Sequence, residues 1–190
     1  MNTLVDFILA SSSPRRIELL KNLDLKFKVI PAKVEENLNL NMEPEDISLF
    51  NANRKANSVA LKSKDKYIAG FDTIVVFENK ILGKPENEKH AFEMLKMLSN
   101  NNHTVITGFS IINIAKNIEI KKAVTTEVWF KKLENIEIKW YISTGEPFDK
   151  AGAYAIQGKG AFMIKKINGS YTNVVGLPLT EFYECLKGLK

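Results

Sequence analysis

The feature that most constrains the fold of this chain is the regular alternation of strand-like and helix-like segments. Phe7 to Ala10 is a short apolar run typical of a buried strand, and Ser13-Pro14 follows it as a helix N-cap with proline in the first turn. Tyr67 to Phe77 is a longer strand candidate in which Gly, Asp and Thr precede an apolar Val-Val core. Such interleaving of strands and helices predicts an α/β domain.

The remaining segments continue this pattern to the end of the sequence. Pro44 opens a segment with apolar residues at helical spacing as far as Ala60, which predicts the longest helix of the chain. The other expected strands are Phe27 to Ile30, Ile81-Leu82 after a turn at 78–80, Thr104 to Ala115, Ile118 to Phe130 and Ala161 to Ile167. The other expected helices are one led by Pro85, one from about Glu134 to Ile142 and one after Pro178, with a loop through Gly158-Lys159-Gly160.

Length and composition fit one globular domain. Of the 190 residues 45% are hydrophobic, and neither a repeat nor a linker interrupts them, so residues 1–190 are expected to form a single domain. Cys185 is the only cysteine, which excludes an internal disulfide and indicates a reducing compartment. No apolar run approaches the roughly 18 residues that span a bilayer, and the first ten residues contain no basic residue. A cytoplasmic protein is therefore expected.

The formal net charge of +5 fits either a nucleic-acid surface or an anion-holding cleft. A nucleic-acid-binding or division-regulating protein should cluster its basic residues and interleave them with aromatic ones. Here the lysines are scattered and often stand near Glu or Asp. We therefore expect neither a nucleic-acid nor a membrane partner. The oligomeric state stays open, a homodimer included.

The segment Ser11-Ser12-Ser13-Pro14-Arg15-Arg16 stands between a predicted strand and the start of a helix. Free backbone N–H groups and the helix dipole attract anions at such a place, and arginine suits phosphate oxygens. The alternative is an ordinary capped helix with two solvated arginines.

Carboxylates that are candidates for chemistry occur at two places in the sequence. Asp72 and Thr73 lie at the edge of an apolar run, where a partly buried carboxylate can bind a metal or accept a proton. Glu35-Glu36 follows the second expected strand and could supply a second metal-binding carboxylate. The alternatives are a turn in which Asp and Thr only bond backbone N–H groups, and a solvated acidic loop.

The other candidates are single polar residues. Lys55 in the long helix and Lys84 in Gly83-Lys84-Pro85 could each neutralise a triphosphate, although either could also be merely solvated. Gln157 is a loop amide able to donate and accept at a base edge. His103 has no Cys or His at ligand spacing, so we expect a structural histidine and not a zinc ligand. Taken together, the set matches the needs of metal-assisted triphosphate cleavage.

An ordered series of segments resembles the Maf family of nucleotide pyrophosphatases almost from end to end. These segments are Phe7 to Arg16, Glu35-Glu36, Arg54-Lys55-Ala56, Gly70 to Val75, Gly83-Lys84-Pro85, His103 to Gly108, Asp149 to Gly158, Ile167 to Tyr171 and Asn173 to Pro178. The resemblance implies a mixed sheet flanked by helices, as in inosine triphosphate pyrophosphatases. It also implies a house-cleaning hydrolase that uses Mg²⁺ or Mn²⁺ and cuts a nucleoside triphosphate to its monophosphate and pyrophosphate.

Carried over residue by residue, the resemblance implies roles for individual side chains. Asp72 is the implied proton acceptor, and Glu36 with Asp72 holds the metal. The implied phosphate-facing residues are Ser11, Arg16, Lys55 and Lys84. Arg15, Thr73 and Gln157 fall on three specificity positions that are similar to those of the dTTP/UTP branch, with modified pyrimidine nucleotides also open as substrates.

Two rival substrates and two departures from the family pattern bear on this expectation. The branch that cleaves 7-methyl-GTP carries Trp, Gln and Glu at the three specificity positions, and a purine house-cleaning enzyme would also need different chemistry around Thr73 and Gln157. Phe71 stands where a small residue usually precedes the Asp, which could narrow the pocket. Glu35 stands where Asp commonly precedes the Glu, which keeps the charge.

Overall fold

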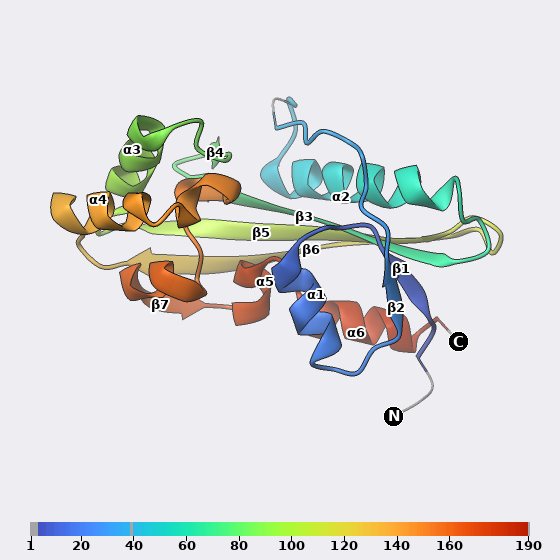
Figure 1. The fold of residues 1–190 in the computed structure, drawn as a ribbon. Helices are drawn as coiled ribbons and strands as arrows, with labels where there is room; N and C mark the ends of the chain where they lie inside the picture. Colours follow the sequence, from blue (N-terminus) through green and yellow to red (C-terminus); the bar gives the residue numbers. More distant parts are fainter. Residues whose placement is uncertain (1–3, 39, 190) are drawn as a thin grey trace. The chain divides into compact units, whose positions relative to one another are not determined.

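The computed structural model describes residues 4–38 and 40–189. Its strands form a seven-stranded sheet in the order β2-β1-β3-β5-β6-β7, with β4 paired to β3 (Figure 1). Strand β1 runs parallel to β2 and β3, whereas the β3–β4 and β6–β7 pairs are antiparallel. The sheet is therefore mixed, and the expected α/β class is confirmed. The strands are β1 (Phe7–Leu9), β2 (Phe27–Val29), β3 (Tyr67–Phe77), β4 (Lys80–Leu82), β5 (Asn102–Asn113), β6 (Ile118–Phe130) and β7 (Ile164–Asn168).

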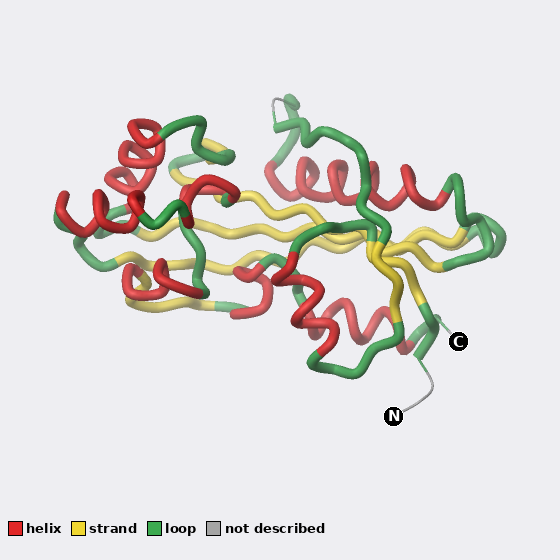
Figure 2. Tube along the Cα trace, viewed as in Figure 1, coloured by secondary structure: helices red, strands yellow, loops and turns green. Residues whose placement is uncertain are grey.

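Helices separate most of these strands along the chain, as Figure 2 shows by colour. The α-helices are α1 (Pro14–Lys21), α2 (Pro44–Ala60), α3 (Glu88–Leu98), α4 (Asn135–Ser143), α5 (Tyr171–Val175) and α6 (Leu179–Lys187). Three 3-10 segments are η1 (Glu146–Asp149), η2 (Ala151–Ala153) and η3 (Gly158–Met163). Within the described residues no helix is long and apolar enough to cross a membrane.

The chain divides into two compact units, and we describe each by itself. The first unit contains the described residues up to Asp72, Thr107–Val124 and the residues from Gly176 onward. The second contains Thr73–Ile106 and Thr125–Val175. Strands β3, β5 and β6 contribute residues to both units.

In the first unit the side chains of β1 alternate between two apolar clusters. Phe7 and Leu9 belong to a cluster that includes Leu20 of α1 and Phe182 of α6. Ile8 and Ala10 belong to a second cluster, with residues of α2 such as Val59. Because successive strand residues point to opposite faces, this unit buries both faces of its part of the sheet. Such burial explains why the β1 sequence is apolar at every position.

The second unit has its own core. Buried residues of β5 and β6 pack there with α3, α4 and the turn around Tyr154; examples are Val105, Val128, Leu95 and Ile138. Gly152, whose φ is 68°, donates its backbone N–H to the Gly83 carbonyl at 3.0 Å. A Cβ at Gly152 would meet the Val75 side chain at 3.0 Å, so this turn lies directly on β3.

Ser13 occupies the N-cap of α1 with Pro14 in the first turn, as expected, although its side chain makes no capping bond and its own N–H is bonded to Ser11 Oγ at 3.2 Å. Three other local expectations are corrected by the structure. Helix α3 begins at Glu88 and not at Pro85, because the Asn87 side chain caps it by accepting from His90 N at 2.9 Å. The expected loop at 158–160 is the start of η3, which delays β7 to Ile164, and α5 was not predicted.

Candidate active site

The centre of the site is an ammonium group held between two carboxylates of the first unit. Lys55 Nζ lies 2.6 Å from Asp72 Oδ1 and 2.8 Å from Glu36 Oε1. Asp72 comes from β3, Lys55 from α2 and Glu36 from the segment between β2 and α2. The structure thus brings together three of the residues that the sequence singled out, from three separate parts of the chain.

Asp72 is the buried member of this cluster, with a side chain that is 1% exposed. Burial raises the pKa of its carboxyl group, while the nearby Lys55 ammonium opposes that rise. Its second oxygen, Oδ2, is buried and has no hydrogen-bond partner. A buried carboxylate oxygen without a partner is costly unless a ligand completes it, so Oδ2 is a candidate ligand atom for a cation or a water molecule.

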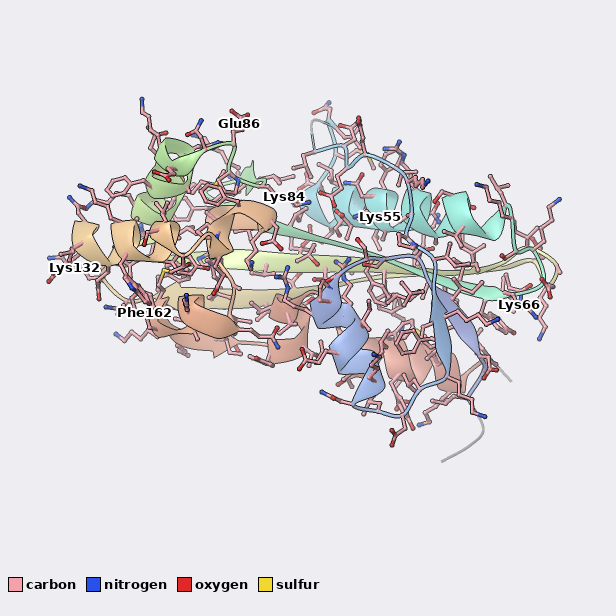
Figure 3. The ribbon with its side chains drawn as sticks, viewed as in Figure 1. Lys55, Lys66, Lys84, Glu86, Lys132 and Phe162 are labelled. Carbon is pink, nitrogen blue, oxygen red and sulfur yellow. The ribbon has the colours of Figure 1, made fainter. Side chains whose placement is uncertain are left out.

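Close packing of α2 against β3 sets the position of Lys55. Gly70 faces the helix, and a Cβ there would lie 2.4 Å from the Ala52 carbonyl oxygen and 2.7 Å from Ala56 N. Only glycine allows the helix backbone to come this near. Lys55, which Figure 3 labels on α2, therefore has its Cα next to the strand and reaches Asp72 across a short gap.

Arg16, which is hydrogen-bonded to Ser11, is a second cationic residue of the site. Its Nε donates to the Gly176 carbonyl at 2.7 Å and its Nη1 to Ser11 Oγ at 3.1 Å. Burial lowers the pKa of Arg16 to about 10, and the attraction of Asp72 and Glu36 works in the opposite direction. The guanidinium therefore stays charged at neutral pH and can bind an anionic group. Arg15 precedes it in the first turn of α1.

Phe71 supports Arg16 from within the core. Its ring is fully buried against Phe109 and Phe182, with centroid distances of 5.9 and 5.1 Å. The Arg16 guanidinium carbon lies 5.7 Å from the centroid of the Phe71 ring. The departure from a small residue at this position thus places an aromatic ring beneath the arginine, in a cation–π contact.

The other predicted site residues belong to the second unit. Thr73 follows Asp72 in β3, and its side chain is half-buried. Lys84, labelled in Figure 3, is an exposed residue between β4 and α3. Gln157 is half-buried and is the N-cap residue of η3. In the first unit, hydrogen bonds join Lys55 to Asp72 and Glu36, and Arg16 to Ser11. Thr73, Lys84 and Gln157 belong to the second unit.

Sequence reasoning missed Asn51, which fixes the segment that carries Glu36. Asn51 is 1% exposed, and its side chain accepts from Asn37 N at 2.9 Å and donates to Asn37 O at 3.0 Å. A buried amide with both groups bonded to one peptide segment holds it in a fixed orientation. The only signal in the sequence was a polar residue on the apolar face of the predicted long helix.

Glu35 and His103 lie outside the cluster. Glu35 is exposed, and its backbone carbonyl accepts from Arg54 Nη1 at 3.1 Å. His103 is buried, with Nε2 at 2.6 Å from Tyr154 Oη, which fits the structural role expected for it. Among residues 4–38 and 40–189 no group of three or more His, Cys, Asp or Glu side chains is arranged to hold a metal.

Comparison with known proteins places the chain in one family. A family model described as "Maf-like protein" matches residues 6–189. A dTTP/UTP pyrophosphatase of Geotalea uraniireducens (strain Rf4) is 48% identical over 187 residues, covering 98% of this chain and 96% of the relative. One of Thermoanaerobacter sp. (strain X514) is 50% identical over 181 residues, covering 95% and 94%.

The fold is also that of a more distant protein. The structure of the Staphylococcus aureus Ham1 protein matches with a TM-score of 0.50 and 17% sequence identity. The match covers 97% of this chain and 100% of the Ham1 chain. At 17% sequence identity this similarity is evidence for the fold only. The family match and the near-full-length relatives together establish that the chain belongs to the Maf family.

Proposed function

We propose that this protein is a nucleoside triphosphate pyrophosphatase that hydrolyses dTTP and UTP to the nucleoside monophosphate and pyrophosphate. The observation that carries the proposal is the similarity of 46–50% identity to relatives named dTTP/UTP pyrophosphatase, over at least 94% of this chain. The cluster of Lys55, Asp72 and Glu36 supports it chemically, because one oxygen of Asp72 lacks a hydrogen-bond partner and Lys55 can bind phosphate. We call these three residues the Lys55 cluster. Modified pyrimidine nucleotides are further candidate substrates.

The buried carboxylate of Asp72 acts as the base in this proposal. Water loses a proton to Asp72 as its oxygen bonds to the α-phosphorus, and the bond from that phosphorus to the bridging oxygen of the pyrophosphate breaks. A raised pKa makes Asp72 a better proton acceptor than an ordinary carboxylate. Ser11, Arg16, Lys55 and Lys84 bind the phosphates, which orients the α-phosphorus and stabilises the developing charge.

The donor set fits a hard divalent cation, Mg²⁺ or Mn²⁺. Glu36 and Asp72 are carboxylates that already surround one cationic group, and Asp72 Oδ2 is a buried oxygen that lacks a partner. These two residues would hold the ion. When bound, such an ion supplies Lewis-acid polarisation of phosphate oxygens and charge neutralisation.

Base choice is assigned in this proposal to Arg15, Thr73 and Gln157. A hydroxyl and a neutral amide can pair with the alternating donors and acceptors on thymine or uracil, whereas a cationic 7-methylguanine favours a carboxylate and a stacking aromatic.

We also propose that residues 1–190 act as one catalytic domain, of which 1–3, 39 and 190 lie outside the described residues. We further propose that the protein is cytoplasmic and works without a nucleic-acid or membrane partner. The family match over residues 6–189 supports a single catalytic domain.

A nucleotide panel tests the proposal. Pyrophosphate and orthophosphate release would be measured for dTTP, UTP, CTP, GTP and 7-methyl-GTP, with wild type and with Gln157→Glu. We expect pyrophosphate as the product, the highest kcat/KM for dTTP and UTP, and a smaller lead of these two in the variant. Orthophosphate release, or a wild-type preference for 7-methyl-GTP, would refute it.

A further inference from the structure

Glu146 of η1 is bonded to the turn that carries Gln157, in the second unit. Its Oε1 accepts from Gly160 N at 3.1 Å and its Oε2 from Lys159 N at 3.1 Å. Tyr141 Oη donates to Oε1 at 3.0 Å. Burial and the negative charge of Glu146 raise the pKa of Tyr141, so the phenol keeps its proton and remains a donor. Three donors therefore converge on one carboxylate.

The turn is wrapped tightly around this carboxylate. Gly158 has a φ of 70°, and a Cβ there would lie 3.0 Å from Glu146 Oε2. A Cβ at Gly160 would meet the Ala155 carbonyl oxygen at 2.5 Å and Tyr141 Oη at 2.8 Å. Both glycines are thus needed for the backbone to approach Glu146 and Tyr141.

Glu146 accepts the backbone hydrogen bonds that the side chain of an N-cap residue would ordinarily accept. Gln157 is the N-cap of η3, yet its side chain makes no capping bond. The first N–H groups of a helix need acceptors, and here a carboxylate from another segment supplies them. The Gln157 amide therefore need not turn back onto its own backbone.

A second anchor fixes the chain on the other side of Gln157. Tyr154 is 5% exposed and its hydroxyl lies 2.6 Å from His103 Nε2, with its ring packed edge-on against Phe130. Gln157 thus stands between a residue locked into the core and two amides bonded to Glu146. The two anchors therefore fix the stretch of backbone from which the Gln157 side chain extends.

From this arrangement we propose that Glu146 is a positioning residue for Gln157, and that it sharpens the choice of base without touching the nucleotide. The inference rests on the proposed function. A site that pairs with a base edge discriminates only if its polar groups are held in register. Loss of the Glu146 anchor lets the Gln157 amide turn, which weakens the discrimination between bases more than it slows hydrolysis in general.

The test compares Glu146→Ala and Glu146→Gln with wild type. Three quantities would be measured: kcat and KM for dTTP, UTP, CTP and GTP; backbone hydrogen exchange of Lys159 and Gly160; and the melting temperature. Glu146→Ala is expected to speed exchange of both amides and to reduce the ratio of kcat/KM for dTTP over GTP by about tenfold, mainly through KM for dTTP. Glu146→Gln, which keeps one acceptor oxygen, should shift both readouts less and covers the case in which the alanine variant fails to fold.

Two further variants separate positioning from a general structural effect. Glu137→Gln is the matched control, because Glu137 also accepts a backbone N–H, that of Glu134 at 2.9 Å, but at the start of α4. It should leave the base ratio unchanged. In a Gln157→Ala background, Glu146→Ala should have no further effect on the ratio, since the group that it positions is gone.

The outcomes distinguish this inference from the proposed function. If wild type releases no pyrophosphate from dTTP or UTP, the proposed function fails and this inference fails with it. If wild type prefers them but both Glu146 variants keep the wild-type ratio, only the positioning role is overturned. A ratio change in the Gln157→Ala background as large as in wild type would also overturn it, because Glu146 would then act independently of Gln157.

Discussion

The buried histidine of the second unit should make the stability of the protein steeply dependent on pH. His103 is 3% exposed on β5, and burial lowers its pKa from an ordinary 6.5 to about 3. Burial also raises the pKa of Tyr154, so its phenol keeps its proton, and the hydroxyl lies 2.6 Å from His103 Nε2. His103 Nδ1 is a buried atom without a hydrogen-bond partner, so a second proton on the ring would not be stabilised by an acceptor at both nitrogens.

The sign and size of the effect follow from these pKa values. Between pH 3 and 6.5 the unfolded chain binds a proton at His103 and the folded chain does not, so the free energy of unfolding falls as the pH falls. The stabilisation is complete above pH 6.5. At roughly 1.4 kcal/mol for each pH unit, acidification from pH 6.5 to 4.5 costs about 2–3 kcal/mol, and the full interval costs about 5 kcal/mol. These losses are large beside a typical stability of about 5–15 kcal/mol.

Denaturant unfolding at a series of pH values measures this effect. Both tryptophans, Trp129 and Trp140, belong to the second unit, so their fluorescence reports on the unit that contains His103. In His103→Gln the amide oxygen can still accept from Tyr154 but cannot titrate, and its stability should fall more slowly than that of wild type between pH 6.5 and 4.5. His90→Gln on α3 is the control and should behave like wild type. Parallel curves for wild type and His103→Gln would refute the reasoning.

The remaining predictions concern the first unit. Asp72→Asn should lower kcat by about 100-fold or more with an unchanged melting temperature, since an amide cannot accept the proton of water; near-normal turnover would exclude Asp72 as the base. Excess EDTA should abolish turnover and added Mg²⁺ restore it, as an activity assay would show. Asn51→Ala should lower the free energy of unfolding by about 1–3 kcal/mol in denaturant titrations, because the segment that carries Glu36 loses two hydrogen bonds. It should also raise KM, whereas the control Asn57→Ala on the same helix should not. Gly70→Ala should destabilise by about 1–3 kcal/mol in thermal melts, since its Cβ would press on the α2 backbone.

Periodicity predicted most of the regular elements, but not α5, and failed where side chains fix the boundaries. Tyr67–Phe77 and Ile118–Phe130 are strands with the expected bounds, because long apolar or alternating runs have few other solutions. The start of α3 was wrong by three residues, since the Asn87 cap and not Pro85 begins the helix. The 3-10 segment at Gly158–Met163 was missed because its acceptor, Glu146, is remote in the sequence.

The candidate site divides in the same way. Asp72, Lys55 and Glu36 could be singled out as polar residues at the ends of elements or on a helix, and in the structure Lys55 hydrogen-bonds both carboxylates. Their roles stay predictions, as do those of Thr73, Lys84 and Gln157. The supporting contacts of Arg16 with Gly176 and of Asn51 with Asn37 could not be predicted. In both, the partner is a backbone group, which every residue type has, so the sequence does not reveal which one is used.

The charge balance around the Lys55 cluster leaves the proposed triphosphate reaction short of positive charge. Lys55 and Arg16 carry two positive charges, which the carboxylates of Glu36 and Asp72 already attract. A triphosphate adds several negative charges, so the same two cations cannot fully neutralise both the carboxylates and the phosphates, and repulsion is strong where one carboxylate is 1% exposed. In the proposed function, Glu36 and Asp72 would hold a divalent ion, which would supply the missing positive charge. Lys55 would then be released towards the phosphate oxygens, a short movement for a flexible side chain. In the proposed function we therefore expect Lys55, which bonds both carboxylates, to be the group whose partner changes when substrate binds.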